Sequence, residues 1–182
     1  MKAIIFFANG TEEVEALTPL DYLKRAGVET LLVGVSDILQ TGSHGITVKT
    51  DVRACDLPKD MDFDLLVFPG GMPGTDNIES SPVARLFLER AAKESKFIGA
   101  ICAAPKILGA RGLLEGKTAT CYPGFEKYLV GAKLSDKKAV RCGNIITATG
   151  AGAANEFAFL LITALYDEKT ADSVARSVRF LI

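Results

Sequence analysis

The feature that most constrains this chain is an alternation of short apolar runs with segments of helical periodicity. The runs have the length of β-strands and contain no polar residues, as in Ile4-Ile5-Phe6-Phe7 and Leu65-Leu66-Val67-Phe68. A strand has this composition when both of its faces are buried, as in a parallel sheet covered by helices on both sides. The pattern therefore predicts an α/β protein, a three-layer α/β/α sandwich around a mostly parallel sheet.

The expected elements follow one another along the whole chain. We expect strands at residues 3–7, 30–33, 65–68 and 97–101, and helices at residues 14–26, 81–92, 156–166 and 170–178. Alternating residues between positions 38 and 52 predict a small hairpin, and Gly143-Asn144 has the residue types of a two-residue turn between two further strands. No repeat, linker or low-complexity tract interrupts the order, so we expect one domain over residues 1–182.

Charge and cysteine content exclude several classes of protein. Lys and Arg total 21 against 22 Asp and Glu, so the net charge of −1 does not attract nucleic acid or anionic lipid. The apolar run at residues 3–8 is too short for a signal peptide or a membrane span, and we expect a cytoplasmic protein. The four cysteines have no CxxC spacing and His44 is the only histidine, so we expect reduced thiols and no metal site.

Cys102 is the strongest candidate for a reactive group. It lies where a buried strand turns into a helix, in Phe97-Ile98-Gly99-Ala100-Ile101-Cys102-Ala103-Ala104-Pro105, with small residues on both sides. This is the layout of a nucleophile elbow, in which the side chain projects from the carboxyl edge of the sheet. The amides of the following helix start would stabilise a thiolate. The alternative for Cys102 is a small buried residue at a strand end. Structural roles are expected for Cys55 and Cys142, in loop or hairpin contexts, and for Cys121, which ends a short strand and is also a candidate neighbour of the site.

A cluster of carboxylates follows the first strand, and at least one of them is expected at the same sheet edge as Cys102. Glu12 and Glu13 are expected to serve the helix N-terminus and solvent. Glu15 lies between Val14 and Ala16 on an apolar helix face, so it is the candidate for burial, and a buried carboxyl tends to stay protonated.

Two glycine-rich turns follow other strands. Gly70 and Gly71, in Pro69-Gly70-Gly71-Met72-Pro73-Gly74, are expected to present backbone amides to a developing oxyanion, unless this is a plain tight turn. The segment Gly150-Ala151-Gly152 lacks the third glycine of a dinucleotide loop and comes too late in the chain for one, so no nucleotide cofactor is expected.

Taken together, NGTEEVEAL after the first strand, the PGG turn, AICAAP and TGAGAANEFA resemble the ThiJ/PfpI superfamily. Within it the chain is most similar to the DJ-one branch, which includes the Parkinsonism-associated protein deglycase and bacterial ThiJ-like relatives. The resemblance covers essentially the full chain. It implies a flavodoxin-like fold of the class I glutamine amidotransferase type, a homodimer, and an oxidation-sensitive cysteine at Cys102. It also implies that a protonated Glu15 lowers the pKa of the thiol, and that the amides of Gly71 and Ala103 form the oxyanion pocket.

The chain departs from this family at one position. Relatives often carry a histidine near the cysteine where this chain has Tyr122, and the protease-like branch has a histidine where this chain has Ala103. Without that base, intracellular peptidase chemistry is the weakest of the candidate functions. Tyr122 and two further residues, His44 and Arg25, are candidate accessory residues of the site. His44 matches a segment that reaches the neighbouring subunit's site, the alternative being a solvated hairpin histidine, and Arg25 matches a basic dimer-interface position, the alternative being an exposed arginine at a helix end.

Two functions remain open. The first is a cofactor-independent glyoxalase or deglycase, of the glyoxalase III type, acting on methylglyoxal or early glycation adducts through a Cys102 hemithioacetal. The second is an oxidative-stress sensor or chaperone that uses oxidation of Cys102. The expected partners are a small dicarbonyl or a glycated protein and a second copy of the chain.

Overall fold

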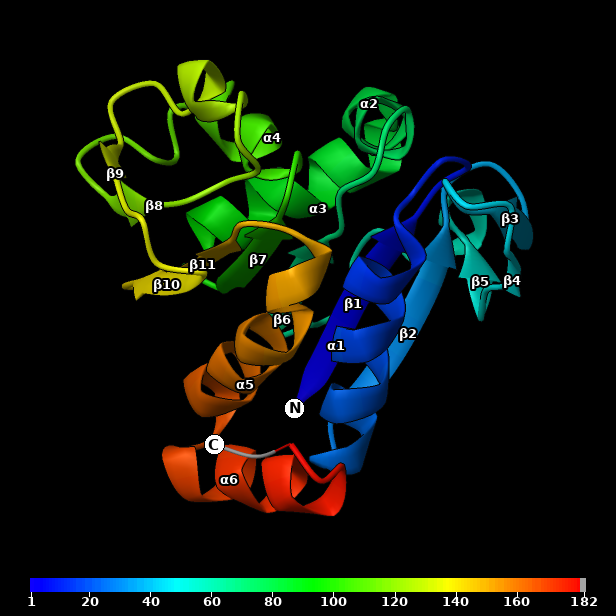
Figure 1. Cartoon of the computed structure of the whole chain (residues 1–182). Helices are drawn as coiled ribbons and strands as arrows, with labels where there is room; N and C mark the ends of the chain where they lie inside the picture. The colour runs from blue at the N-terminus through cyan, green and yellow to red at the C-terminus, as the bar shows by residue number, and fades with distance from the viewer. Residues whose placement is uncertain (181–182) are drawn as a thin grey trace.

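A seven-stranded sheet forms the centre of the protein in the computed structural model, which describes residues 1–180 (Figure 1). The strand order is β10-β11-β7-β6-β1-β2-β5, and every neighbouring pair is parallel except β10 and β11. The strands are β1 (Lys2–Phe7), β2 (Glu29–Gly34), β5 (Val52–Arg53), β6 (Leu65–Phe68), β7 (Phe97–Ile101), β10 (Ala139–Cys142) and β11 (Ile145–Ala148). The predicted mostly parallel sheet is therefore confirmed.

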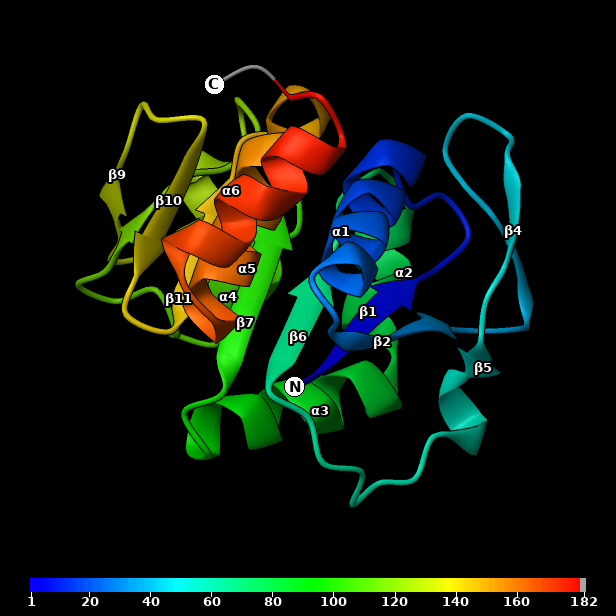
Figure 2. The same ribbon diagram turned by 90° about the horizontal axis from the view of Figure 1, so that it is seen from below.

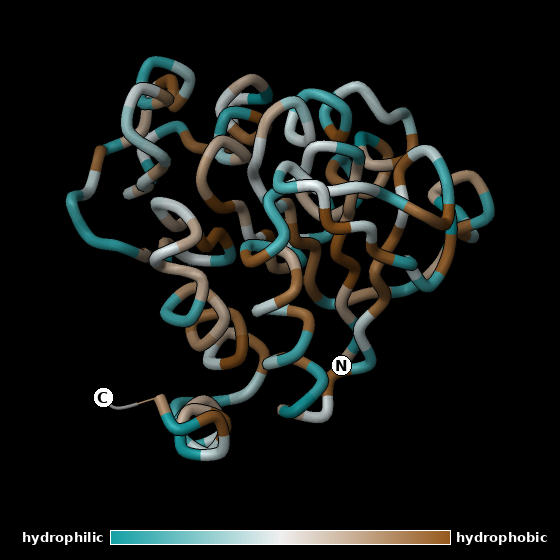
Figure 3. Tube along the Cα trace, turned by 45° about the vertical axis from the view of Figure 1, so that its right-hand side comes forward, coloured by the Kyte–Doolittle hydropathy of each residue, from teal (hydrophilic) through white to brown (hydrophobic). Residues whose placement is uncertain are grey.

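Helices cover both faces of this sheet, as the continuous apolar strands require. On one face lie α1 (Glu13–Arg25), α5 (Ala154–Leu165) and α6 (Glu168–Ser177), and on the other lie α2 (Gly74–Ser80), α3 (Pro82–Lys93) and α4 (Pro105–Gly109), as Figures 1 and 2 show. Alternate β1 side chains point into opposite cores: Ile5 and Phe7 pack in the α1–α5 core, and Ile4 and Phe6 pack in the α2–α3 core. In Figure 3 the hydrophobic stretches of the trace run through the interior, where these strands lie.

The remaining elements are short. β3 (Leu39–Thr41) and β4 (Thr47–Lys49) form the predicted hairpin, which lies at the β5 end of the sheet (Figure 2). The second predicted hairpin is β10–β11, with Gly143 at φ 63° in its turn. The short strand expected before Cys121 is β8 (Thr118–Ala119), which pairs with β9 (Lys133–Leu134). β9 and three one-turn helices, at residues Ala54–Asp56, Glu126–Tyr128 and Ala151–Ala153, were not anticipated, because two or three residues carry no periodicity.

The strand order indicates which edge of the sheet is expected to bind ligands. From β1 the chain crosses to β2 on one side and later returns through β6 on the other, so the strand order reverses between β1 and β6. In open α/β sheets this reversal leaves a crevice at the carboxyl ends of the strands, where ligands bind. The loops that follow β1, β6, β7 and β11 all begin at this edge.

Among residues 1–180, no helix is long and apolar enough to cross a membrane.

Candidate active site

Cys102 lies directly after β7, on a backbone turn that few non-glycine residues adopt. Its φ is 64°, in the left-handed region, and residues held there carry on the order of 1–3 kcal/mol of strain. Two hydrogen bonds fix the turn: the Cys102 amide donates to Ala148 O at 2.9 Å, and the Tyr122 amide donates to Cys102 O at 2.9 Å. The turn therefore holds Cys102 at the carboxyl edge of the sheet, next to the end of β11.

Glu15 reaches the same edge of the sheet from the first turn of α1. The Glu12 carboxylate caps this helix by accepting from the Glu15 amide at 2.7 Å, which fixes where the helix starts. The Glu15 side chain is 1% exposed, accepts a hydrogen bond from the Gly70 amide at 2.9 Å and another from the Ala151 amide, and hydrogen-bonds the Cys102 thiol. The structure thus brings together the cysteine and the carboxyl group that the sequence singled out.

Backbone amides surround the sulfur atom. Hydrogen bonding from the amides of Gly71 and Ala103 acts to lower the pKa of the Cys102 thiol, and these are the two amides that the resemblance assigns to an oxyanion pocket. Gly70 has a different role from the one expected, because its amide is bound to Glu15 rather than directed at the sulfur. A Cβ atom at Gly70 would lie 2.6 Å from both Cys102 Cβ and Glu15 Oε2, so only glycine lets the thiol and the carboxyl approach each other here.

Burial dominates the acid–base properties of the pair. Burial raises the pKa of Glu15 to about 7, and burial followed by the repulsion of the nearby Glu15 charge raises the pKa of Cys102 to about 12. The pair therefore loses its first proton near neutral pH and retains its second. The Gly71 and Ala103 amides favour the resulting charge on sulfur, whereas the Gly70 and Ala151 amides favour it on the carboxylate.

This result corrects the expectation of a thiol with a lowered pKa. The helix after Cys102 was expected to stabilise a thiolate, but α4 has only five residues and begins at Pro105, three positions beyond the cysteine. The two amides that do lower the thiol pKa are outweighed by burial and by the second acid beside it. In a pair of this kind, the position of the shared proton determines when the sulfur is nucleophilic.

Glu13 was expected in solvent and is instead buried, with 3% of its surface exposed. It accepts hydrogen bonds from the His44 amide at 2.9 Å and the Ile46 amide at 3.3 Å, and its Oε2 lies 2.9 Å from His44 Nδ1. These contacts anchor the turn of the β3–β4 hairpin to α1. The sequence could not reveal this role, because the partners lie 31 and 33 positions away.

The accessory candidates are at the margin of the site or outside it. The His44 side chain is 68% exposed and is paired with Glu13 within the same chain. Arg25 lies at the far end of α1, where its Nε donates to Asp21 at 2.7 Å. Tyr122 is half exposed and its ring borders Gly150: a Cβ there would lie 3.3 Å from the ring and 3.8 Å from Glu15 Oε1. Of the three, only Tyr122 therefore borders the Cys102–Glu15 pair.

The other cysteines differ in environment. Cys121 is buried beside the turn that binds Cys102 O, and burial raises its pKa to about 11. Cys55 is exposed in a one-turn helix, and Cys142 is half-buried at the end of β10.

Sequence reasoning missed the hydrogen bond from the Ala151 amide to Glu15, although the TGAGAA segment that contains Ala151 was part of the resemblance.

One group of side chains in the described part of the chain has the composition of a metal site. The ligand atoms of Glu12, Glu13 and His44 lie within 4.8 Å of one another. Each already has a protein partner, since Glu12 caps α1 and Glu13 binds His44 and two amides. These contacts account for the cluster without an ion.

Comparison with known proteins agrees with this geometry. The DJ-1/PfpI family model matches residues 1–164. A glutathione-independent glyoxalase of Caenorhabditis elegans, DJR-1.2, is 31% identical over 95% of this chain and 92% of its own length, and a deglycase of Pyrococcus abyssi is 31% identical over 81% and 89%. The solved structure of Toxoplasma gondii DJ-1, oxidized, superposes with a TM-score of 0.95 at 31% identity, covering 100% of this chain and 99% of that one. The chain belongs to the DJ-1/PfpI family.

Proposed function

We propose that this protein is a cysteine-dependent, cofactor-independent glyoxalase or deglycase. The observation that carries the proposal is the close approach of Cys102 and Glu15 on either side of Gly70, in a buried pair that loses one proton near neutral pH and whose thiol pKa the Gly71 and Ala103 amides act to lower. The names of the Caenorhabditis elegans and Pyrococcus abyssi relatives support the same chemistry.

The first step is addition of the Cys102 sulfur to the aldehyde carbon of methylglyoxal. A carbon–sulfur bond forms, the carbonyl electron pair moves to oxygen, and the oxygen takes the proton of the pair, giving a hemithioacetal. The Gly71 and Ala103 amides stabilise the negative charge that develops beside the sulfur. The charged sulfur is the nucleophile, so the step requires the state in which Glu15 holds the shared proton.

The second step is an isomerisation assisted by Glu15. As carboxylate, Glu15 removes the proton from the former aldehyde carbon to give an enediolate and then returns it to the neighbouring carbon, while the hydroxyl proton passes from the first oxygen to the second. The first carbon is oxidised and the second is reduced, so no external oxidant or reductant is needed. The product is a lactoyl thioester on Cys102, which water hydrolyses to lactate and the free thiol. A carboxyl with a pKa of about 7 is suited to exchange protons in both directions at neutral pH.

Displacement of the side-chain group from a hemithioacetal or aminocarbinol on a protein by the same thiol would reverse early glycation. A bond forms between the Cys102 sulfur and the dicarbonyl carbon, the carbon–sulfur or carbon–nitrogen bond to the side chain breaks, and the departing group takes the proton of the pair. This extension differs from the glyoxalase reaction in having a leaving group at that carbon.

The test compares wild type, Cys102→Ser and a matched control, Cys142→Ser, in a buffer free of amines that trap dicarbonyls. Both methylglyoxal loss and lactate formation are measured. We expect lactate from wild type and Cys142→Ser and none from Cys102→Ser. Lactate from Cys102→Ser would refute the mechanism, and dicarbonyl loss without lactate from wild type would indicate trapping rather than turnover.

A second candidate is sensing of oxidants by Cys102. The Gly71 and Ala103 amides and a protonated Glu15 offer three hydrogen-bond donors to a sulfinate, and a solved relative is described as oxidized. Mass spectrometry after mild peroxide treatment tests it: selective addition of two oxygens at Cys102 supports sensing, and uniform oxidation of all four cysteines contradicts it.

A further inference from the structure

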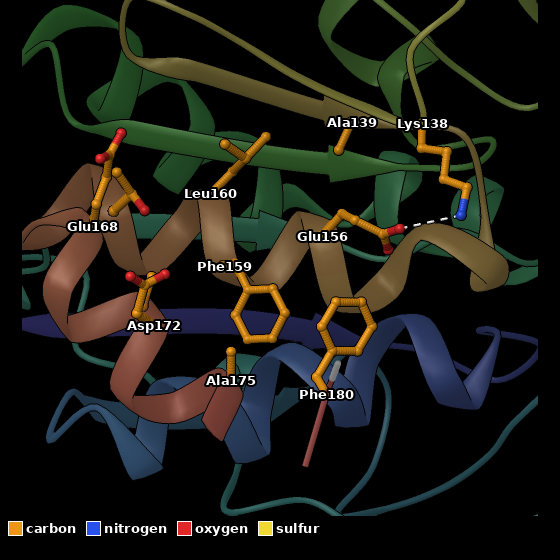
Figure 4. A pocket seen from close by; sticks show the side chains of 11 residues that line it. Lys138, Ala139, Glu156, Phe159, Leu160, Glu168, Asp172, Ala175 and Phe180 are labelled. Atoms are coloured by element: carbon orange, nitrogen blue, oxygen red, sulfur yellow. Dashed lines mark hydrogen bonds and ion pairs between the residues drawn. The ribbon is translucent and has the colours of Figure 1, made fainter. Parts of the chain in front are cut away.

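A cavity of about 420 Å³ lies on the side of α5 that faces α6 and the start of β10, distinct from the Cys102 crevice. Its apolar lining consists of Ala139, Phe159, Leu160, Ala171, Ala175 and Phe180. This volume is in the range of pockets that bind small organic molecules. Figure 4 shows the two phenylalanine rings between the carboxylates at the two ends of the cavity.

Neighbouring aromatic rings fix the position of Phe159 in the lining of the cavity. The ring of Phe159 stacks on Tyr22 of α1 with centroids 5.3 Å apart, and the Phe180 ring lies 5.2 Å from it at an interplanar angle of 59°. Tyr22 is fixed in turn by a hydrogen bond of 2.7 Å to Asn155. The Phe159 ring is thus a preformed surface, which lowers the entropy cost of binding.

The charges around the cavity are unbalanced. Glu156, Glu168 and Asp172 line it, and the one cation among its lining residues, Lys138, lies 3.2 Å from Glu156 Oε1. Within residues 1–180, neither Glu168 nor Asp172 has an ion pair. These two carboxylates are four residues apart on α6, where like charges repel across one helical turn. A cation bound between them would relieve that repulsion.

We propose that this cavity binds a small organic cation with an apolar body, such as a primary ammonium group on an aryl-alkyl chain. The apolar body fills the space over Phe159 and Leu160, and the ammonium lies between Glu168 and Asp172. Aromatic ring faces also attract cations, so Phe159 and Phe180 favour the same charge as the carboxylates. An anionic ligand of the same shape would meet the excess of negative charge and bind less tightly.

The test uses three probes of similar shape and different charge: phenethylamine, phenethyl alcohol and phenylpropionate. Affinities are measured by NMR on the folded protein at neutral pH and low salt, following the methyl signals of Thr163 and Ala175. We expect phenethylamine to bind with a Kd on the order of 1 mM. We expect it to bind about threefold to tenfold more tightly than the alcohol, with phenylpropionate the weakest.

Variants test whether the probes bind in this cavity and whether the two carboxylates cause the preference for the cation. Glu168→Gln with Asp172→Asn should remove the preference for the cation while leaving the alcohol bound, and Glu89→Gln on α3, across the sheet, should change nothing. Thr163→Trp, at a half-exposed position, should block all three probes without altering the melting temperature. Equal affinities for the three probes, a preference that survives in the double variant, or binding that survives in Thr163→Trp would each overturn the proposal. None of these readouts depends on turnover at Cys102.

Discussion

Glu13 and Glu15 lie on opposite sides of the first turn of α1 and are almost equally buried, but their pKa values are shifted in opposite directions. Glu13 and Glu15 are 3% and 1% exposed, yet the pKa of Glu13 is lowered and that of Glu15 is raised to about 7. Two positions along a helix point in nearly opposite directions, so one carboxyl faces the β3–β4 hairpin and the other faces the sheet edge. Burial raises the pKa of both groups, so the partners must account for the difference.

The partners explain the contrast. Glu13 meets an imidazole and the amides of His44 and Ile46, whose hydrogen bonds together outweigh its burial. For Glu15, burial is the largest cause of the raised pKa and repulsion from Glu12 adds to it, whereas the hydrogen bonds from the Cys102 thiol and from two backbone amides lower the pKa without offsetting burial. The carboxyl that anchors the hairpin is thus kept ionised, and the carboxyl in the crevice is kept near the point at which it exchanges its proton. The following predictions test this contrast.

The largest expected effect is on catalysis. Glu15→Gln should lower kcat/KM for methylglyoxal by about 100-fold to 10,000-fold, because it removes the proton-transfer group and keeps the shape. Glu13→Gln, the matched variant on the other side of the helix turn, should leave kcat/KM nearly unchanged. Lactate formation measured for both variants gives the answer. Equal losses in the two would mean that the turn as a whole, and not the Glu15 proton, supports turnover.

The next effect is on stability as a function of pH. The pKa of Glu15 is raised in the folded protein from 4.5 to about 7, so folding favours the protonated form and stability falls as pH rises between these values. The loss amounts to about 3 kcal/mol by pH ~8. Glu15→Gln should abolish this loss, which urea unfolding at pH ~5 and ~8 would measure. If the free energy of unfolding changed with pH by the same amount in wild type and in Glu15→Gln, the raised pKa of Glu15 would be contradicted.

The sequence predicted one half of this contrast and missed the other. Glu15 was identified because Val14 and Ala16 indicate an apolar helix face, and Cys102 because small residues surround a strand end. Both signals are local in the chain. Glu13 was misassigned because its burial depends on a hairpin turn that folds back from residues 42–46.

The same distinction applies to the fold. The strands buried on both faces were predicted to within a residue or two, because their apolar composition follows from that burial. A helix was expected after Cys102, but its short length and its start at Pro105 were not, and the two-residue strands β5 and β9 were not predicted, since tertiary contacts rather than periodicity define them. The assignment of the Gly70 amide to Glu15 likewise required the three-dimensional structure, because the two residues are 55 positions apart.

A smaller effect is expected at the glycine that separates the two acids of the site. Gly70→Ala places a methyl group 2.6 Å from Cys102 Cβ and Glu15 Oε2, which should cost about 1–3 kcal/mol of stability and most of the turnover. Gly152→Ala is the control, because no atom lies within 4 Å of its added Cβ. Thermal melts and lactate assays on both variants measure the two effects. A fully active Gly70→Ala would show that the close approach of thiol and carboxyl is not needed.

The smallest effect is expected at His44, on the hairpin side of the helix turn. The hydrogen bond and charge of Glu13 raise the pKa of His44 above 6.5, so the pair contributes stability that is fully present below pH ~6.5 and is lost as pH rises through the folded value. His44→Gln should therefore be slightly less stable than wild type in mild acid and equally stable in mild alkali, while keeping full turnover. The imidazole is largely exposed, and solvent screens the pair, which keeps the difference small. Melting temperatures across the pH range measure it. A large loss of turnover in His44→Gln with unchanged melting would instead place the imidazole at a reacting centre, as expected if the hairpin reaches the site of a second subunit.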